Sequence, residues 1–284
     1  MLPLLYVVIA MASVQSGASL AKQLFPAFGA TGTVALRVTL AAVILAALLR
    51  PWRQPVARAK FPALIVYGAS LAGMNICFYL SLRTIPLGPA VAIEFVGPLA
   101  VVLLHSRRLL DLLWLGLAIA GLVLMLPAGI TGADLDPVGA LLALAAGICW
   151  GIYIVSGQRA GAENGMQAAA LGMLVAAAIA LPVGAPALAQ APMSLTLALV
   201  AVGVAILSSV IPYTLEMIAL RRLPPQTFGM LMSLEPAVAT LAGFTFLCER
   251  LTTTELAAIA LVMLASAGAI MTSRSTTADV PPTA

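Results

Sequence analysis

Hydrophobic positions form long runs along this chain, and polar positions separate the runs at intervals of about one membrane span. No charged residue occurs between Lys60 and Arg83, and none occurs between Glu163 and Glu216. A transmembrane helix needs ~20 predominantly apolar residues, so the first interval accommodates one helix. The second interval is too long for one helix, and its Pro- and Gly-containing segment at 182–192 divides it in two. The pattern therefore predicts an integral membrane protein made of helices.

Over the whole chain this pattern predicts an all-α integral membrane protein with ten transmembrane helices. The expected spans are 3–24, 30–49, 62–82, 87–106, 111–128, 137–158, 166–184, 195–219, 226–247 and 253–272. Lys and Arg are enriched in cytoplasmic loops, so their distribution indicates the orientation. With the N-terminus inside, the cytoplasmic segments hold Arg50, Arg53, Arg58, Lys60, Arg107, Arg108, Arg159, Arg221, Arg222 and Arg274, against Lys22, Arg83 and Arg250 outside. Both termini are therefore expected to be cytoplasmic.

The chain also contains an internal repeat, visible at a shift of 138 positions. This shift places the segment 83–86 (RTIP) on 221–224 (RRLP), and Gly97-Pro98 on Glu235-Pro236. A weaker explanation is that any two halves of such a protein share Leu, Ala and Gly. Five spans per repeat is an odd number, so the second repeat must enter the membrane in the opposite direction. Inverted repeats of this kind occur in many secondary transporters, with the substrate site near the midplane between the halves.

These landmarks set the expected domain organisation. A first five-helix repeat occupies 1–128, a periplasmic linker 129–136, a second five-helix repeat 137–272, and a disordered cytoplasmic tail 273–284. Small residues such as Gly17, Ala21, Gly147 and Gly151 recur at a spacing of four, which lets membrane helices approach closely.

Composition agrees with a membrane protein and excludes several other classes. The chain is 62% hydrophobic and 8% charged, whereas soluble domains are about 25% charged. Its net charge of +4 is spread over short loops, which does not favour nucleic-acid binding. The N-terminus opens directly into an apolar run, so we expect a retained helix rather than a cleaved signal peptide. The cysteines at 77, 149 and 248 are odd in number and far apart, and indicate no disulfide framework.

Enzyme signatures are absent from the sequence. The single histidine, His105, lies at a predicted helix end, and no G-x-S-x-G, H-E-x-x-H, P-loop or Rossmann glycine pattern occurs. No segment is long enough to form a nucleotide-binding domain. We therefore expect neither an enzyme nor a cofactor or metal site.

Three charged residues, Arg37, Glu94 and Glu235, fall near the middle of predicted spans. A charge at this depth is costly and tends to mark a substrate or ion path. A zwitterionic amino acid would match them, with its ammonium group at a Glu and its carboxylate at Arg37. The alternative is that Arg37 is the permanent counter-ion of one Glu. Since the charges are unequal in number, one carboxylate would still need a proton, a cation or a substrate amine.

Several other residues are candidates for roles along the same path. Glu216 is a possible gate, although a snorkelling ion pair with Arg221 is the favoured interpretation. Pro98 and Pro236 are possible hinges, because a missing N–H permits a bend, or they are ordinary kinks. Polar side chains that could line the cavity, or could equally form interhelical hydrogen bonds, are Gln15, Ser19, Asn75, Tyr79, Trp150, Tyr153 and Tyr213.

Long motifs in this sequence resemble a known family. They are ASVQSGASLAKQLFPAFGATG, ALRVTLA, GMNICFYLSLRTIPLGPAVAIEFVGPLAV, SGQRAGAENG and PYTLEMIALRRLPPQTFGMLMSLEPA, spread between about Met11 and Met271. The chain resembles the EamA-type members of the drug/metabolite transporter superfamily, and among them the inner-membrane exporters of threonine and homoserine in bacteria. The resemblance implies proton-driven export of small amino acids across the inner membrane.

The residues and the resemblance together predict an exporter of small neutral amino acids that works by alternating access between inverted halves. An exporter of broader range for metabolites or drugs remains the nearest alternative. A lipid-modifying membrane enzyme or an assembly factor is the alternative of another class. The expected partners are amino-acid substrates, protons and the lipid bilayer, without nucleic acid.

Overall fold

The computed structural model describes most of the chain as helices. The described residues are 2–21, 23–53, 56, 60–85, 90, 93–105, 109–125, 136–192, 194–232, 234–235 and 238, with 253–254, 257–258, 260–261, 263–265 and 268. They contain no strand, so the prediction of an all-α protein is confirmed for this part of the chain. The predicted linker, apart from Asp136, and the predicted tail lie outside the described residues.

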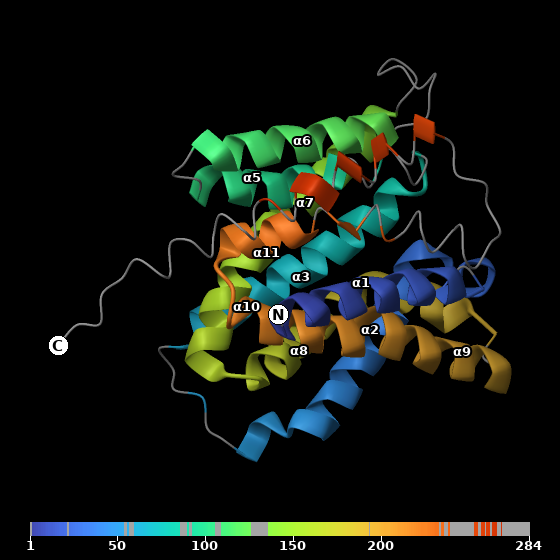
Figure 1. Cartoon of the computed structure of the whole chain (residues 1–284). Coiled ribbons are helices and arrows are strands. Elements are labelled where there is room, and N and C mark those ends of the chain that lie inside the picture. Colours follow the sequence, from blue (N-terminus) through green and yellow to red (C-terminus); the bar gives the residue numbers. More distant parts are fainter. Residues whose placement is uncertain are drawn as a thin grey trace.

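Figure 1 shows the described helices. In chain order they are α1 (Leu2–Ala21), α2 (Phe25–Leu49), the short 3₁₀ turn η1 (Pro51–Arg53), α3 (Phe61–Ser81), α5 (Val96–His105), α6 (Leu109–Met125), α7 (Pro137–Asn164), α8 (Gln167–Gln190), α9 (Leu195–Ala205), the π-helical turn η4 (Ile206–Val210), α10 (Ile211–Leu220) and α11 (Pro225–Met232). Among them, short turns join α7 to α8 and α10 to α11.

Five of these helical segments are long and apolar enough to cross a membrane. They are α2, α3, α7, α8 and the continuous stretch Leu195–Leu220, which joins α9, η4 and α10. Pro3–Gly17 and Leu109–Gly121 form shorter apolar helices. α5 and α11 cover parts of the predicted fourth and ninth spans. The protein is therefore a multi-pass membrane protein, and the complete set of ten spans stays a prediction.

Several helix boundaries differ from the prediction, and α7, for example, ends at Asn164 instead of 158. α2 starts at Phe25 but breaks at Gly29, whose φ of 61° is not helical, so its regular part begins at residue 30 as predicted. α8 was predicted to end at 184, yet it continues through Pro182 and Pro186 to Gln190. Proline removes one backbone donor, but unpaired backbone in lipid costs more, so a membrane helix tends to continue across it.

Helices distant in the sequence pack as pairs. α2 lies along α8, α3 lies along α7, and α1 lies along α10 and η4. α5 packs on α7, α6 and α11, and Figure 1 shows α5 and α6 together at one side of the bundle. α8 offers α2 and α3 a face of buried Ala and Gly, on which small side chains permit close approach.

The contact between α5 and α7 is made by backbone rather than side chains. A Cβ on Gly97 would overlap the carbonyl oxygen of Gly147, and a Cβ on Gly147 would lie 2.5 Å from the carbonyl oxygen of Glu94. A Cβ on Gly151 would lie 3.3 Å from the carbonyl oxygen of Gly97. The close approach predicted from the glycine spacing is confirmed here, and it fixes Glu94 against α7.

The start of α7 is fixed by a cap. Asp136 accepts a hydrogen bond of 2.8 Å from the backbone N–H of Gly139, which satisfies a free donor of the first turn. This backbone bond, together with the hydroxyl of Thr84, lowers the pKa of Asp136. The cap therefore connects the turn after α3 with the beginning of α7.

The glycine crossing generates a prediction about stability. Gly97→Ala should lower the free energy of unfolding by about 1–3 kcal/mol, because an added methyl group forces two backbones apart. The matched control is Gly116→Ala on α6, where no described heavy atom lies within 4 Å of the new methyl group. That control should be neutral or stabilising by up to about 1 kcal/mol. Unfolding of the purified variants in an SDS titration measures both, and equal effects of the two changes would contradict the crossing.

Candidate functional site

Arg37 lies buried on α2, with 5% of its surface exposed. One guanidinium nitrogen donates to the side-chain oxygen of Asn75 on α3. Another donates to the backbone carbonyl of Ser208 in η4, at 3.3 Å. The guanidinium carbon also lies 5.2 Å from the ring centre of Tyr79, a cation–π contact. Arg37 is thus held by three neighbours, none of which carries a negative charge.

This arrangement decides one of the alternatives left by the sequence. If Arg37 were a permanent counter-ion, it would contact Glu94 or Glu235. The ion pair found among the described residues is instead Arg159 with Glu163, at the end of α7. The counter-ion interpretation is therefore wrong for this structure, because α2 directs the guanidinium toward α3 and η4.

Asn75 makes the centre of a hydrogen-bond network between three helices. Its side-chain nitrogen donates to the backbone carbonyl of Leu71 at 2.8 Å and to the hydroxyl of Tyr213 on α10 at 3.1 Å. Its side-chain oxygen accepts from Arg37. An amide can donate and accept at once, which lets it join a cation on α2 to a hydroxyl on α10. The network thereby positions Arg37, and the predicted polar role of Asn75 and Tyr213 takes this form.

The π-helical turn η4 forms the other side of the Arg37 site. π turns often occur at functional sites, because the wider turn displaces backbone groups from the regular helix. α1 packs directly on η4: Ser13 donates to the carbonyl of Leu207 at 2.6 Å, and a Cβ on Gly17 would lie 2.8 Å from the backbone nitrogen of Ser208. Nε of Arg37 and Oγ of Ser208 are buried with no hydrogen-bond partner among the described residues. The site therefore has unused polar capacity.

Glu216 differs from its favoured interpretation. It is buried, with 8% of its surface exposed, and its carboxylate accepts a hydrogen bond of 2.7 Å from the hydroxyl of Tyr153 on α7. The snorkelling pair with Arg221 is therefore wrong. The reason is the rotation of α10, which turns Glu216 toward α7, while Arg221 caps the end of the helix and is exposed.

Aromatic rings connect this carboxylate with the Arg37 network. The rings of Tyr153 and Tyr213 meet edge to face, with centres 6.0 Å apart, and Tyr153 also stacks on Tyr67 at 5.2 Å. Tyr153 bonds Glu216, and Tyr213 bonds Asn75. A cation on one side and a carboxylate on the other are thus linked through two touching tyrosines.

Glu94 and Glu235 form a second acidic region. Glu94 is 8% exposed just before α5, and Glu235 is half-buried after α11. Glu235 lies within electrostatic range of both Glu94 and Glu216. Among the described residues, neither the carboxylate of Glu94 nor that of Glu235 has a hydrogen-bond donor of its own.

The remaining candidates have varied positions. Trp150 is buried edge-on against Phe95 at 5.0 Å, and Gln15 is half-buried on α1. Pro98 is buried in α5, and its carbonyl faces Gly229 of α11. The side chain of Ser19 and the whole of Pro236 lie outside the described residues. Sequence reasoning missed Ser208, because nothing in the residues ILSSV signals a π-helical turn.

Comparisons with known proteins agree over nearly the full chain. Residues 137–271 match the EamA-like transporter family. A protein of Escherichia coli (strain K12) named threonine/homoserine exporter RhtA is 51% identical over 273 residues, covering 96% of this chain and 92% of that protein. Its counterpart of the same name in Salmonella typhimurium (strain SL1344) is 50% identical with the same coverage. A crystal structure titled only as that of a protein has a TM-score of 0.76, is 22% identical and covers 95% of this chain and 98% of its own, which shows a shared fold.

The Arg37 network generates a prediction with an internal control. Asn75→Leu keeps the branched shape but removes the acceptor of a buried cation, so the free energy of unfolding should fall by about 1.5–3 kcal/mol. Tyr213→Phe removes only a hydroxyl and should cost less. The double variant Arg37→Leu/Asn75→Leu leaves no buried cation without an acceptor, so it should be more stable than Asn75→Leu alone. Thermal unfolding in detergent measures all three, and a double variant less stable than the single one would contradict the network.

Proposed function

Because the chain belongs to the EamA-like transporter family, we propose that it is a secondary active exporter of threonine, homoserine and related small neutral amino acids. The proposed mechanism is alternating access across the inner membrane, coupled to protons. The relatives named as exporters align with 96% of this chain, and about half of the aligned residues are identical. Since these relatives are transporters, the chain is not an enzyme, and the lipid-modifying alternative falls away.

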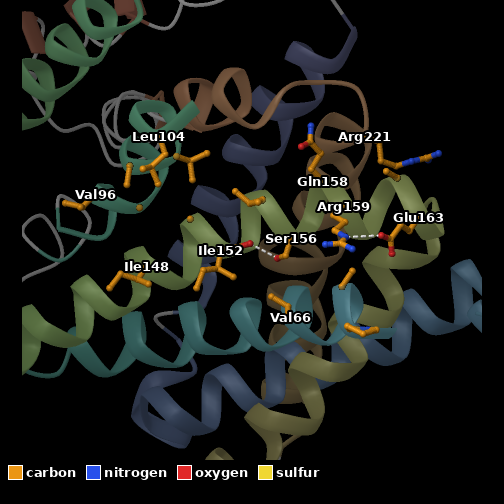
Figure 2. A pocket seen from close by; sticks show the side chains of 18 residues that line it. Val66, Val96, Leu104, Ile148, Ile152, Ser156, Gln158, Arg159, Glu163 and Arg221 are labelled. Atoms are coloured by element: carbon orange, nitrogen blue, oxygen red, sulfur yellow. Dashed lines mark hydrogen bonds and ion pairs between the residues drawn. The ribbon is translucent and has the colours of Figure 1, made fainter. Parts of the chain in front are cut away.

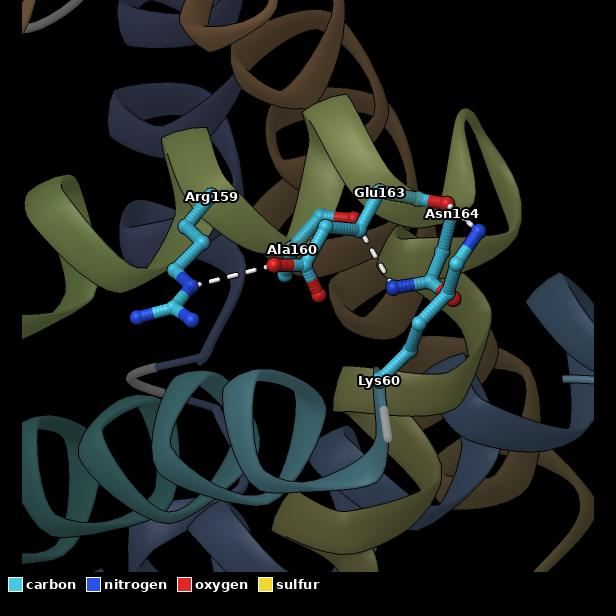
Figure 3. Close-up of polar contacts among 5 residues, drawn as sticks. All are labelled: Lys60, Arg159, Ala160, Glu163 and Asn164. Carbon is cyan, nitrogen blue, oxygen red and sulfur yellow. Dashed lines mark hydrogen bonds and ion pairs between the residues drawn. The ribbon is translucent and has the colours of Figure 1, made fainter. Parts of the chain in front are cut away.

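The proposed orientation, with both termini in the cytoplasm, is supported by the helix ends that meet. Lys60, at the start of α3, donates to the backbone carbonyl of Glu163 near the end of α7, at 2.7 Å (Figure 3). Gln158 of α7 donates to the carbonyl of Leu223 beyond α10 at 3.0 Å. The beginning of α3 therefore lies beside the ends of α7 and α10. This grouping brings basic residues of three predicted cytoplasmic segments to one side.

The proposed inverted repeat is supported by the packing of the helices. A shift of one repeat relates α1 to α7, α2 to α8, α3 to the α9–α10 segment, and α5 to α11. If each helix is replaced by its repeat partner, the contact of α3 with α7 becomes a contact of α10 with α1. Both contacts occur in the structure. The contacts of α2 with α8 and of α5 with α11 exchange with themselves. The family match also begins at residue 137, the expected start of the second repeat.

The observation that carries the proposed site is the buried, unneutralised charge of Arg37. A charge within a span is costly unless it is paired, and the described neighbours of Arg37 are neutral. A substrate carboxylate would remove this cost and could use the free Nε donor. We assign Arg37 to the carboxylate of the amino acid for this reason.

The acidic residues take the complementary roles in this proposal. Glu94 and Glu235 lie within electrostatic range of one another, so two ionised carboxylates in a bilayer would need a cation. A proton supplies it in the empty site, and the ammonium group of the substrate supplies it in the loaded site. Glu216, bonded to Tyr153, is the proposed gate. Pro98 and Pro236 are the proposed hinges.

The decisive experiment is pH-gradient-driven movement of labelled threonine and homoserine in proteoliposomes. The unchanged protein should transport both, and Glu94→Gln should lose stimulation by the gradient, because a permanently neutral amide cannot exchange a proton. The amide substitution keeps the size of the side chain. Transport by Glu94→Gln with full dependence on the gradient would refute the role of Glu94. Absence of transport by the unchanged, folded protein would refute the substrates and direct the search toward a broader metabolite or drug exporter.

Arg37→Gln is the companion variant in the same assay. It should raise the half-saturating concentration of threonine at least tenfold, since the loss of a charge-assisted hydrogen bond of about 1.5 kcal/mol or more corresponds to that factor. Arg50→Gln, an exposed residue that caps the end of α2, is the matched control and should leave transport unchanged. Equal transport by the two variants would contradict a substrate contact at Arg37.

A further inference from the structure

A groove of about 1010 Å³ opens along α7, between α3 and α5 (Figure 2). Its walls are apolar side chains such as Val66 of α3, Leu104 of α5 and Ile152 of α7, which are 47%, 80% and 43% exposed. The proposed solute site is elsewhere, because Arg37, Glu94 and Glu235 do not line the groove. Exposed apolar walls on the spans of a membrane protein face hydrocarbon chains, so the groove is suited to an acyl chain rather than to an amino acid.

The floor of the groove is formed by the glycine crossing of α5 and α7. Gly97 and Gly151 both line the groove, and their backbones touch without an intervening side chain. Helices that meet through backbone cannot close the space above them by changing rotamers. The floor of the groove is therefore set by backbone contacts rather than by side-chain rotamers.

The charged residues of the groove gather at one end. Figure 2 shows Gln158, Arg159, Glu163 and Arg221 together at this end, away from Val96 and Ile148. The stem of Arg221 lies over the end of α7, since a Cβ on Gly161 would be 2.7 Å from its Cγ.

The charge at this end is positive on balance. Arg159 pairs with Glu163 at 3.0 Å, but its side chain is 76% exposed and keeps its other nitrogen donors (Figure 3). The hydrogen bond of Lys60 within the described part of the chain goes to the backbone carbonyl of Glu163, so this contact does not neutralise its charge. Arg159, Arg221 and Lys60 thus face one carboxylate. An apolar groove with a basic end has the chemistry of an anionic lipid site.

We propose that this groove binds one anionic phospholipid, with an acyl chain along α7 and the phosphate on Arg159 and Arg221. The basic end of the groove distinguishes this site from the ordinary lipid-facing surface of a membrane protein. Such a surface does not select lipids with a negatively charged head group. The phosphate would lie on the side of the membrane where the starts and ends of α3, α7 and α10 meet. This site is independent of which solute the protein carries.

The test is native mass spectrometry of the full-length protein, purified in detergent and supplied with equal amounts of phosphatidylglycerol and phosphatidylethanolamine. The unchanged protein should retain one phosphatidylglycerol in preference to phosphatidylethanolamine. Arg159→Gln/Arg221→Gln should weaken phosphatidylglycerol retention roughly tenfold, because the attraction of two basic residues is lost. Ala100→Trp, which fills the apolar part, should displace both lipids without a change in charge.

The matched control is Arg50→Gln/Arg53→Gln. It makes the same change in charge at a separate polar pocket of about 390 Å³, beside Gln167. It should leave the preference intact. Equal losses from the two double variants would overturn the proposal, because they would indicate general attraction to a basic surface. The proposal is also overturned if phosphatidylglycerol is not preferred, or if Ala100→Trp alters the oligomeric state instead of lipid retention, since the groove would then bind a second copy of the chain.

Discussion

A guanidinium without a carboxylate partner, placed within the helix bundle, is the constraint on which this structure depends. Arg37 is 5% exposed, so its guanidinium depends on polar groups of the neighbouring helices. The side-chain oxygen of Asn75 and a backbone carbonyl of the π-helical turn η4 accept hydrogen bonds from Arg37. The ring of Tyr79 makes a cation–π contact with it. Neutral partners stabilise such a charge only in part, because hydrogen bonds replace the lost hydration but do not cancel the charge. The remaining cost favours binding of an anion, which is the property that a carboxylate site requires.

The small residues of the bundle follow from the same requirement. A polar network across α2, α3 and α10 can form only if the helices approach closely enough for short side chains to meet. Gly17 permits α1 to lie against η4, and Gly172 of α8 accommodates the ring of Tyr67. In lipid the hydrophobic effect does not drive helices together, so close packing and interhelical hydrogen bonds have to do so. The glycines and the polar residues are two parts of one solution.

The sequence revealed the charges and the spans but not the direction in which side chains point. Runs of apolar residues between charges predicted α3 and α7 nearly at their observed starts. The glycine spacing predicted close helix approach, but not that α5 and α7 are the helices that cross. Glu216 was misassigned, because its five-residue separation from Arg221 is compatible with either an inward or an outward rotation of α10. The rotation depends on Tyr153, 63 positions away. The partner of Arg37 could not be predicted for the same reason. A position in the middle of a span does not reveal which other helix its side chain faces.

Charge balance connects the proposed site with exchange of a proton for an amino acid. Among the described residues of this region, three carboxylates, Glu94, Glu216 and Glu235, stand against the single cation of Arg37. Complete ionisation would leave a net charge of −2 within the spans, which a bilayer does not tolerate, so the empty site has to hold protons. A zwitterion changes no net charge when it binds. Its ammonium group can nevertheless take the place of a proton on one carboxylate, while its carboxylate neutralises Arg37. In the proposed mechanism each substrate bound releases one proton, so the loaded site is one unit more negative than the empty one. The reverse exchange on the other side of the membrane would restore that proton, which is antiport.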